Sequence, residues 1–342
     1  MISIIILNYN GRDFIGKTIE SVLFGDFQDF EVIFFDNNSL DGSYEFVKEK
    51  YSGHRKIKII KSSKNLGFAG GNNKAFEYTK GEVVFFLNSD AFIEKNCLVK
   101  IHEFFNDHKD AGIAQCKIKM AKEKDFIENA GNYSDTLGLA YIIGYNEKDN
   151  DQYEDVRKIF TANGAAFAMR REIFEKLKGF DEDYFLLYEE TDLCWRARIA
   201  GAEIYYLPMA LVYHLGSASF QKKKKRKKAG SLDSTYLFIR NRMDSMIKNY
   251  ELKNLAAYLP AHLVFMFFYS LYYLTRGRFE SFISLYKAVF YNLFHLKHIL
   301  DKRKIVQKTR VIRDSEFFKK NYIKSFSFVR IINKVLRKNV DK

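Results

Sequence analysis

The first hundred residues alternate short apolar runs with stretches in which apolar residues recur at helical spacing. The apolar runs lie at 2–8, 30–36, 56–60 and 83–87, and the helical stretches lie at 13–24, 41–51, 72–79 and about 94–106. Runs rich in β-branched and aromatic residues between amphipathic helices predict parallel strands covered on both faces. The expected fold class is therefore α/β, and ligands of such sheets bind beyond the carboxyl ends of the strands.

The next segments are predicted to complete a mixed sheet. Short apolar stretches within 125–170 predict further strands, and they are followed by helices at 171–177 and from about Glu189 to Gly201, and by a short strand at 203–207. Glycine and asparagine residues at 65–71 are predicted to lead into the helix at 72–79.

Residues 255–274 form a stretch of twenty residues without a formal charge. This length is sufficient to span a bilayer. However, Pro260 and His262 interrupt the stretch and tyrosine is abundant, which favours a hairpin of helices over about 250–300 lying in a membrane interface. A single spanning helix at 255–274 is the alternative.

Charge divides the 342 residues into two parts. The whole chain has a net charge of +14, but residues 221–342 hold 29 basic and 8 acidic residues, so that residues 1–220 are net acidic. We therefore expect a first domain at 1–220 and a basic, aromatic helical region at 221–342 that associates with an anionic membrane surface. Nucleic acid is disfavoured as the partner, because the first part is acidic and contains no recognisable nucleic-acid module.

The three cysteines are far apart and include no CxxC pair, which argues against a zinc ribbon or a disulfide framework. The turn after the first strand lacks the GxGxxG fingerprint of dinucleotide-binding domains, and no Walker A loop is present. The absence of these two nucleotide-binding motifs argues against NAD and against a P-loop phosphate site at the edge of the sheet.

Polar residues follow the predicted strands at this edge. Asp36 and Asp90 each end a buried strand, and an acidic cluster of Glu189, Glu190 and Asp192 opens a helix. Each acid has an alternative explanation, either as a helix cap or as a favourable charge in a first turn. Two acids at the tips of strands in one sheet nevertheless favour a site for a cation or a cation-bearing ligand.

The motifs SIIILNYNG, DNNSLDGS, NLGFAGGNN, FFLNSDA, GAAFAMRREIFEKLKGFDEDYFLLYEETDLCWRAR and VYHLGSAS occur in this order. Together they resemble the family 2 glycosyltransferases over about residues 1–250, and more narrowly their rhamnosyltransferase-like branch. The resemblance implies the GT-A fold, a mixed sheet between helices. It also implies inverting transfer of a sugar from a nucleotide diphosphate donor, with Mg²⁺ or Mn²⁺ as cofactor.

The resemblance assigns a role to each part of the sheet edge. Asn88-Ser89-Asp90 stands at the DxD position and retains only the last acid, so Asp90 is the expected metal ligand. His214 would complete the metal shell or touch the diphosphate, or alternatively is a structural histidine. Glu190 stands at the position of the general base, with Glu189 and Asp192 as the other candidates; Asp192 alternatively fixes the local helix.

The nucleotide is expected on the neighbouring strands. Asp36 would accept a hydrogen bond from the imide of uracil or thymine, which favours a UDP- or dTDP-sugar. The remaining residues expected near the donor are Asn8, Tyr9, Asn10, Asn38, Asn65, Gly70, Asn72 and Asn88. A glycine-rich entry to a helix is the alternative for the members of this set at 65–72.

The partner expected from family and charge is a glycan acceptor that is carried on a lipid at the cytoplasmic face of a membrane during assembly of a surface polysaccharide. Two other functions remain open from the sequence. One is a nucleotidyltransferase, and the other is a non-catalytic relative that binds nucleotide sugars.

Overall fold

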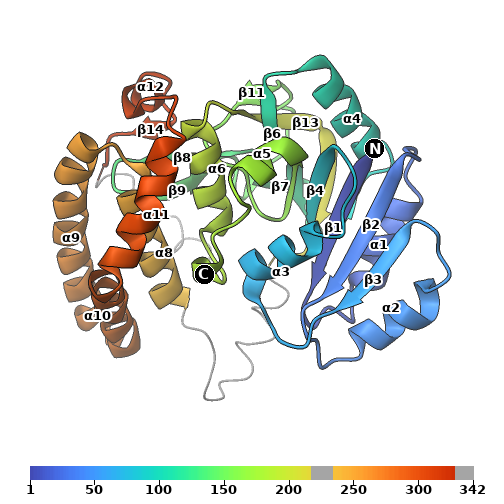
Figure 1. The fold of residues 1–342 in the computed structure, drawn as a ribbon, viewed down its shortest axis with the longest axis horizontal. Helices are drawn as coiled ribbons and strands as arrows, with labels where there is room; N and C mark the ends of the chain where they lie inside the picture. The colour runs from blue at the N-terminus through green and yellow to red at the C-terminus, as the bar shows by residue number, and fades with distance from the viewer. Residues whose placement is uncertain (217–233, 328–342) are drawn as a thin grey trace.

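The computed structural model describes residues 1–216 and 234–327. Its central sheet contains the four predicted parallel strands in the order β3-β2-β1-β4, and Figure 1 shows them at the right of the molecule. Their bounds are β1 Ile2–Asn8, β2 Phe30–Asp36, β3 Ile57–Lys61 and β4 Val83–Asn88. The predicted parallel core is confirmed.

The sheet becomes mixed beyond β4. β12 (Ala166–Arg170) pairs antiparallel with β4 and with β6 (Ala111–Met120), and β13 (Glu203–His214) pairs parallel with β6. β13 is twelve residues long, so the prediction of a short strand at 203–207 was wrong. The register shifts between Leu207 and Leu211, and the chain then continues along β6 as far as His214.

Shorter strands extend and flank this sheet. β5 (Ala91–Ile93) and β11 (Arg157–Lys158) pair with β13, and β7 (Phe126–Asn129) and β10 (Glu147–Lys148) follow β6. A separate small sheet contains β8 (Asn132–Asp135), β9 (Ala140–Ile142) and β14 (Ile323–Lys324).

Helices cover both faces of the sheet. Alternate residues of β1 enter different cores: Ile4 and Ile6 lie in one, and Ile5 in the other. This alternation explains the continuous apolar runs in the sequence. The helices of this part are α1 Ile15–Leu23, α2 Ser43–Tyr51, α3 Gly67–Phe76, α4 Cys97–Asp107, α5 Arg171–Lys176 and α6 Glu189–Ile199, and a 3₁₀ turn, η1, lies at Glu182–Tyr184.

The glycines predicted to precede a helix lie inside α3, which begins at Gly67 rather than near Asn72. A Cβ atom at Gly71 would lie 2.6 Å from Leu7 Cδ1. Gly71 therefore allows α3 to pack closely against β1, and this packing accounts for a glycine that the sequence pattern placed in a loop.

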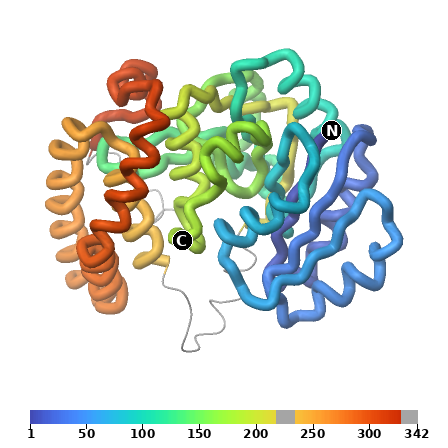
Figure 2. The backbone as a smooth tube through the Cα atoms, in the orientation of Figure 1, coloured from blue at the N-terminus to red at the C-terminus, as the bar shows by residue number. Residues whose placement is uncertain are grey.

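The C-terminal helices pack against the same body, and Figure 2 shows the path of the chain through them. Trp195 and Ile199 of α6 share a core with Met243 and Met246 of the first of these helices. The helices are α8 Ser234–Asn249, α9 Leu252–Thr275, α10 Phe279–Phe294, α11 Leu296–Lys308 and α12 Asp314–Lys319. The helices of the predicted hairpin over 250–300 are confirmed, and their place in a membrane interface stays a prediction. The domain boundary at 220/221 falls outside the described residues.

Candidate active site

The tips of β1 and β2 are joined by buried side chains. The amide nitrogen of Asn8 donates hydrogen bonds to Asp36 Oδ1 at 2.9 Å and to Ser43 Oγ at 2.8 Å, while Asp36 Oδ2 accepts one from the Ser39 backbone at 2.9 Å. Asn8 and Asp36 have no exposed surface. These contacts order the loop after β2, and the predicted contact between Asp36 and a base stays a prediction.

The residues above this pair are more open. Tyr9, Asn10 and Asn38 are partly exposed, and Asn10 and Asn38 adopt positive φ angles of 56° and 66°. The side-chain oxygen of Asn10 accepts a hydrogen bond from the Leu40 backbone at 2.8 Å. The two turns after β1 and β2 therefore brace each other at the edge where a nucleotide is expected.

Asn37 links this edge to α3 and was missed by the sequence analysis. Its amide nitrogen donates to Asn65 Oδ1 at 3.0 Å and to the Gly67 carbonyl at 2.9 Å, and its Oδ1 accepts from the Leu66 backbone at 2.8 Å. No local pattern distinguishes Asn37 from its neighbour Asn38, because its partners lie about thirty residues away.

The three residues predicted in the glycine-rich segment have contacts within the protein. Asn65 Oδ1 accepts a hydrogen bond from the Gly67 backbone at 2.9 Å, and the buried amide of Asn72 donates to the Phe68 carbonyl at 3.0 Å. Gly70 faces Leu66, whose Cβ would lie 3.3 Å from an added methyl group. These contacts serve the start of α3, and contacts of these residues with a nucleotide remain predictions.

The tip of β4 and the end of β13 bring Asp90 and His214 together. His214 pairs with Ala91 in the sheet, and its Nε2 lies 3.1 Å from Asp90 Oδ1. On the other side of the ring, Nδ1 donates to Glu128 Oε1 at 2.6 Å, and Asn88 Nδ2 lies 3.5 Å from Nε2. Asp90 and His214 are both buried.

The electrostatics of this group suit a divalent cation. Burial disfavours the charged imidazole, but hydrogen bonds to Asp90 and Glu128 outweigh burial and raise the pKa of His214 to about 10. A carboxylate on Nδ1 orients the ring and increases the basicity of Nε2, which is the arrangement common around metal-bound histidines. The facing Nε2 and Oδ1 atoms therefore fit a shared hard cation, which would replace the proton between them.

Glu128 was not found from the sequence. It stands in the short strand β7, between Ile127 and Asn129, where one acid among apolar and polar residues carries no metal-binding pattern. It reaches His214 because β7 pairs with β6, and β6 pairs with β13.

The acids at the start of α6 lie at the same edge of the sheet. The Cγ atom of Glu190 would lie 3.7 Å from a Cβ atom added at Gly164, and the neighbouring Ala165 carbonyl accepts a hydrogen bond from the Asn88 backbone at 2.9 Å. This path connects Glu190 to the tip of β4. Burial raises the pKa of Glu190 to about 6, although part of the residue is exposed.

Glu189 and Asp192 have different surroundings from Glu190. Glu189 is 4% exposed, burial raises its pKa well above the ordinary value, and its Oε2 lacks a hydrogen-bond partner among the described residues. Asp192 is fully enclosed and accepts hydrogen bonds from Arg196 Nε at 2.7 Å and Ser245 Oγ at 2.9 Å. The contacts of Asp192 support the alternative that it fixes the helix.

A second acidic group lies apart from the predicted residues. Asp149, Asp151 and Glu154 could place carboxylate oxygens within 4.8 Å of one another. However, Asp149 is paired with Lys117 at 2.8 Å and with Lys119 at 2.9 Å, and Glu154 also contacts Lys117. The two lysines therefore already offset the charges of Asp149 and Glu154.

The fold and the motifs agree with known proteins. The chain is 25% identical over 232 residues to the rhamnosyltransferase WbbL of Escherichia coli, which covers 63% of this chain and 83% of WbbL. The matches to three further curated relatives span 25% to 61% of the length of those relatives.

Solved structures share the same fold at lower sequence identity. Staphylococcus aureus TarS 1–349 in complex with UDP-GlcNAc has a TM-score of 0.54 and 20% identity, with 90% of both chains covered. GalNAc-T7 with UDP, GalNAc and Mn²⁺ has a TM-score of 0.58 and 13% identity, with 75% of this chain and 49% of that chain covered.

The family model for glycosyl transferase family 2 matches residues 3–178, which is more than half of the chain. The matched region contains β1, β2 and β4 with their polar tips, and it ends before the acidic pair of α6. The chain therefore belongs to glycosyl transferase family 2, as its motifs predicted.

Proposed function

We propose that this protein is an inverting glycosyltransferase that moves rhamnose or another hexose from a UDP- or dTDP-sugar to a glycan acceptor. The observation that carries the proposal is the convergence of the Asp90–His214–Glu128 group and Glu190 on one edge of the sheet in a family 2 chain. The rhamnosyltransferase WbbL and the UDP-GlcNAc and Mn²⁺ complexes of the fold relatives support the donor and metal classes.

Asp90 and His214 would hold Mg²⁺ or Mn²⁺ at the edge of the sheet formed by the carboxyl ends of the strands. Such a cation, when bound, offsets the negative charge that develops on the departing diphosphate. Glu128 keeps the His214 ring in place through Nδ1. Tyr9, Asn10 and Asn38 would line the nucleoside pocket, since they are the partly exposed residues at the neighbouring strand tips.

Glu190 would act as the general base. The acceptor hydroxyl oxygen attacks the anomeric carbon, the bond from that carbon to the phosphate oxygen breaks, and the hydroxyl proton passes to the Glu190 carboxylate. A single displacement of this kind inverts the anomeric centre. A pKa of about 6 suits the role, because the carboxylate is mostly ionised at neutral pH and more basic than an ordinary glutamate.

The acceptor is proposed to be a lipid-linked glycan at the cytoplasmic face of a membrane. Among the described residues, α9 is the one helix long and apolar enough to cross a membrane. One side of α9 packs on the protein body through Phe265, Met266 and Tyr273. Its other side exposes a continuous apolar surface, which consists of Leu263, Val264, Phe267, Phe268, Leu271 and Leu274.

Because α9 packs on the protein along one side and is exposed along the other, we favour a helix that lies in the membrane interface over one that crosses the bilayer. The inward His262 Nδ1 lies 3.1 Å from the Leu137 carbonyl. Exposed Lys253 and Arg276 lie at the two ends of α9, and exposed Lys287 lies in α10. Each basic residue near an anionic leaflet contributes about 1 kcal/mol to binding.

The test of the activity is nucleoside diphosphate release from a panel of UDP-, dTDP- and GDP-sugars, with Mg²⁺ or Mn²⁺ and a lipid-linked glycan acceptor. We expect turnover with a uridine or thymidine donor. Asp90→Ala should lose both metal-dependent donor binding and transfer, whereas Glu190→Gln should bind the donor and lose transfer. Donor binding without turnover would indicate a non-catalytic relative. Pyrophosphate release in a parallel assay that supplies a nucleoside triphosphate and a sugar 1-phosphate would indicate a nucleotidyltransferase.

The test of the membrane surface is co-sedimentation with vesicles that contain anionic lipid. Replacing both Phe267 and Phe268 with Asp should reduce binding. Phe24→Asp is the matched control, because Phe24 is 71% exposed at the end of α1 and lies outside the proposed surface. Equal binding by both variants would exclude α9 as the docking face.

A further inference from the structure

The segment that leads into α6 has an unusual backbone. Phe185, Leu187 and Tyr188 have φ angles of 58°, 71° and 77°. Residues other than glycine adopt this region at a cost, and such conformations persist only where surrounding contacts hold them. Because Tyr188 directly precedes Glu189 and Glu190, this segment sets the direction in which α6 begins.

Asn241 of α8 supplies contacts of this kind. Its amide nitrogen lies 3.1 Å from the Tyr184 carbonyl, 3.0 Å from that of Leu186 and 2.6 Å from that of Leu187. Its Oδ1 accepts a hydrogen bond from Arg240 Nε at 2.8 Å, which fixes the orientation of the amide. Asn241 has no exposed surface.

Two further contacts hold the same segment. Arg240 Nη2 donates to the carbonyls of Asp183 at 2.7 Å and Tyr184 at 3.0 Å. From the opposite side, the Phe68 backbone of α3 donates to the Phe185 carbonyl at 2.6 Å. The segment is therefore clamped between α8 and α3.

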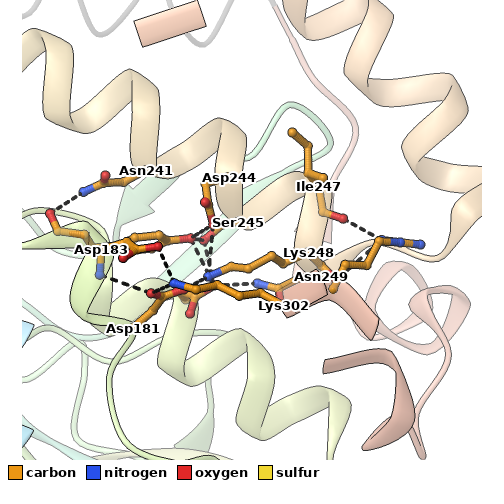
Figure 3. Close-up of polar contacts among 12 residues, drawn as sticks. Asp181, Asp183, Asn241, Asp244, Ser245, Ile247, Lys248, Asn249 and Lys302 are labelled. Carbon is orange, nitrogen blue, oxygen red and sulfur yellow. Dashed lines mark hydrogen bonds and ion pairs between the residues drawn. The ribbon is translucent and has the colours of Figure 1, made fainter. Parts of the chain in front are cut away.

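A buried lysine of α8 forms ion pairs with residues on both sides of this segment. Lys248 is 1% exposed; it contacts Asp181, and its Nζ lies 3.3 Å from Asp192 and 3.0 Å from Asp244. Figure 3 shows Lys248 and Lys302 of α11 converging on Asp181. Asp181 precedes the segment and Asp192 lies in the first turn of α6, so one ammonium group connects the two.

We propose that α8 positions the general base, with Asn241 as the positioning residue that holds segment 184–188 in the conformation that presents Glu190 to the acceptor. This inference rests on the proposed function and adds to it. It gives the C-terminal helices a role in the chemistry that is separate from membrane docking.

The main test compares Asn241→Ala with the wild-type protein in the transfer assay. We expect kcat to fall by about 100-fold, since a displacement of about 1 Å in a reacting group can have this effect. The KM for the donor and metal-dependent nucleotide binding should be unchanged, because the described side-chain contacts of His214 are made with Asn88, Asp90 and Glu128, which lie outside α8.

The pH profile distinguishes positioning from a general loss of stability. A loosened segment admits water to Glu190, so the acid limb of kcat/KM should move down from about pH 6 toward the ordinary carboxyl range. Besides burial, the charge of Glu190 raises the pKa values of its neighbours Glu189, Tyr188 and Cys194. A partly unfolded population would lower the rate equally at every pH and leave the limb in place.

Asn254→Ala is the matched control. Asn254 of α9 also uses its amide nitrogen to hold a distant residue, donating to Asp314 Oδ2 at 2.8 Å, but it contacts nothing near Glu190. It should keep the wild-type kcat and pH limb even if it unfolds more easily. Arg240→Ala is the second test variant if Asn241→Ala does not fold, with a smaller loss of kcat and the same direction of shift.

The outcomes separate this inference from the proposed function. A wild-type protein that turns over no donor overturns both. An active wild-type protein, together with a folded Asn241→Ala or Arg240→Ala variant that keeps the wild-type kcat and acid limb, overturns the positioning role alone.

Discussion

The pH dependence of transfer is the sharpest prediction from the site. Burial raises the pKa of Glu190 to about 6 from an ordinary value of 4.5. A general base acts only when it is deprotonated, so activity should be lost as the pH falls through about 6. This range lies above the one in which an exposed glutamate would titrate.

The size of the effect follows from the ionised fractions. With a pKa of about 6, about nine-tenths of Glu190 is ionised at pH 7 and about one-tenth at pH 5, so that kcat/KM should fall about 10-fold between them. With an ordinary pKa, about three-quarters would remain ionised at pH 5, and the fall would be only about 1.3-fold.

The assay measures initial rates of nucleoside diphosphate release at low acceptor concentration across this range. Metal and donor are kept saturating at every pH, so that protonation near Asp90 and His214 does not enter the profile. Glu190→Gln should lower the rate by about 10²- to 10⁴-fold and abolish the acid limb. A flat profile between pH 5 and 7, or a limb that survives in Glu190→Gln, would refute the assignment of the base.

Three further predictions follow from the buried charges. Glu128→Gln should weaken Mn²⁺ binding by about 10- to 100-fold in calorimetry, because His214 loses its orienting carboxylate, whereas the exposed Glu123→Gln should have no effect. Lys248→Met should lower the free energy of unfolding in urea by about 3–5 kcal/mol, since it leaves three carboxylates without their shared ammonium; Lys304→Met, 73% exposed, should change it by less than about 0.5 kcal/mol. Although burial opposes ionisation, Lys248 holds the pKa values of Asp181 and Asp192 below 3.8. The stabilising effect of these two carboxylates should therefore be present above about pH 4 and lost below it. Equal slopes of the free energy of unfolding against pH in the wild type and Lys248→Met would contradict this.

Sequence predicts those site residues whose position follows from the strand or helix that they directly adjoin. Asp90 follows an apolar run that is buried on both faces, so its place at the sheet edge follows from the strand alone. Glu128 could not be found in this way, because it lies 86 residues from His214 and meets it only through the pairing of β7, β6 and β13.

Lys248 illustrates a second limit. A lysine in a helix ordinarily faces water, and nothing near it in sequence predicts three carboxylates around it. Two of them, Asp181 and Asp192, come from the segment before α6 and from α6 itself, more than fifty residues away. The basic character of the C-terminal region therefore combines two kinds of residue, those that are exposed to solvent and those that are buried against the acidic N-terminal part.

The composition of α8 explains why these helices belong to the site. The helix buries Asn241, Asp244, Lys248 and Asn249, a set of polar side chains that would be costly inside an apolar bundle. Each of them has a hydrogen-bond or ion-pair partner in the 181–192 segment, which offsets the cost of burying it. The segment in turn depends on α8, because Asn241 and Arg240 donate hydrogen bonds to the carbonyls of the strained backbone before Glu190. The same helices expose the apolar face of α9 on their outer side, where Figure 1 places α9 at the edge farthest from β1–β3. If α9 docks on a membrane as proposed, a connection of this kind would hold Glu190 at a constant distance from the membrane surface.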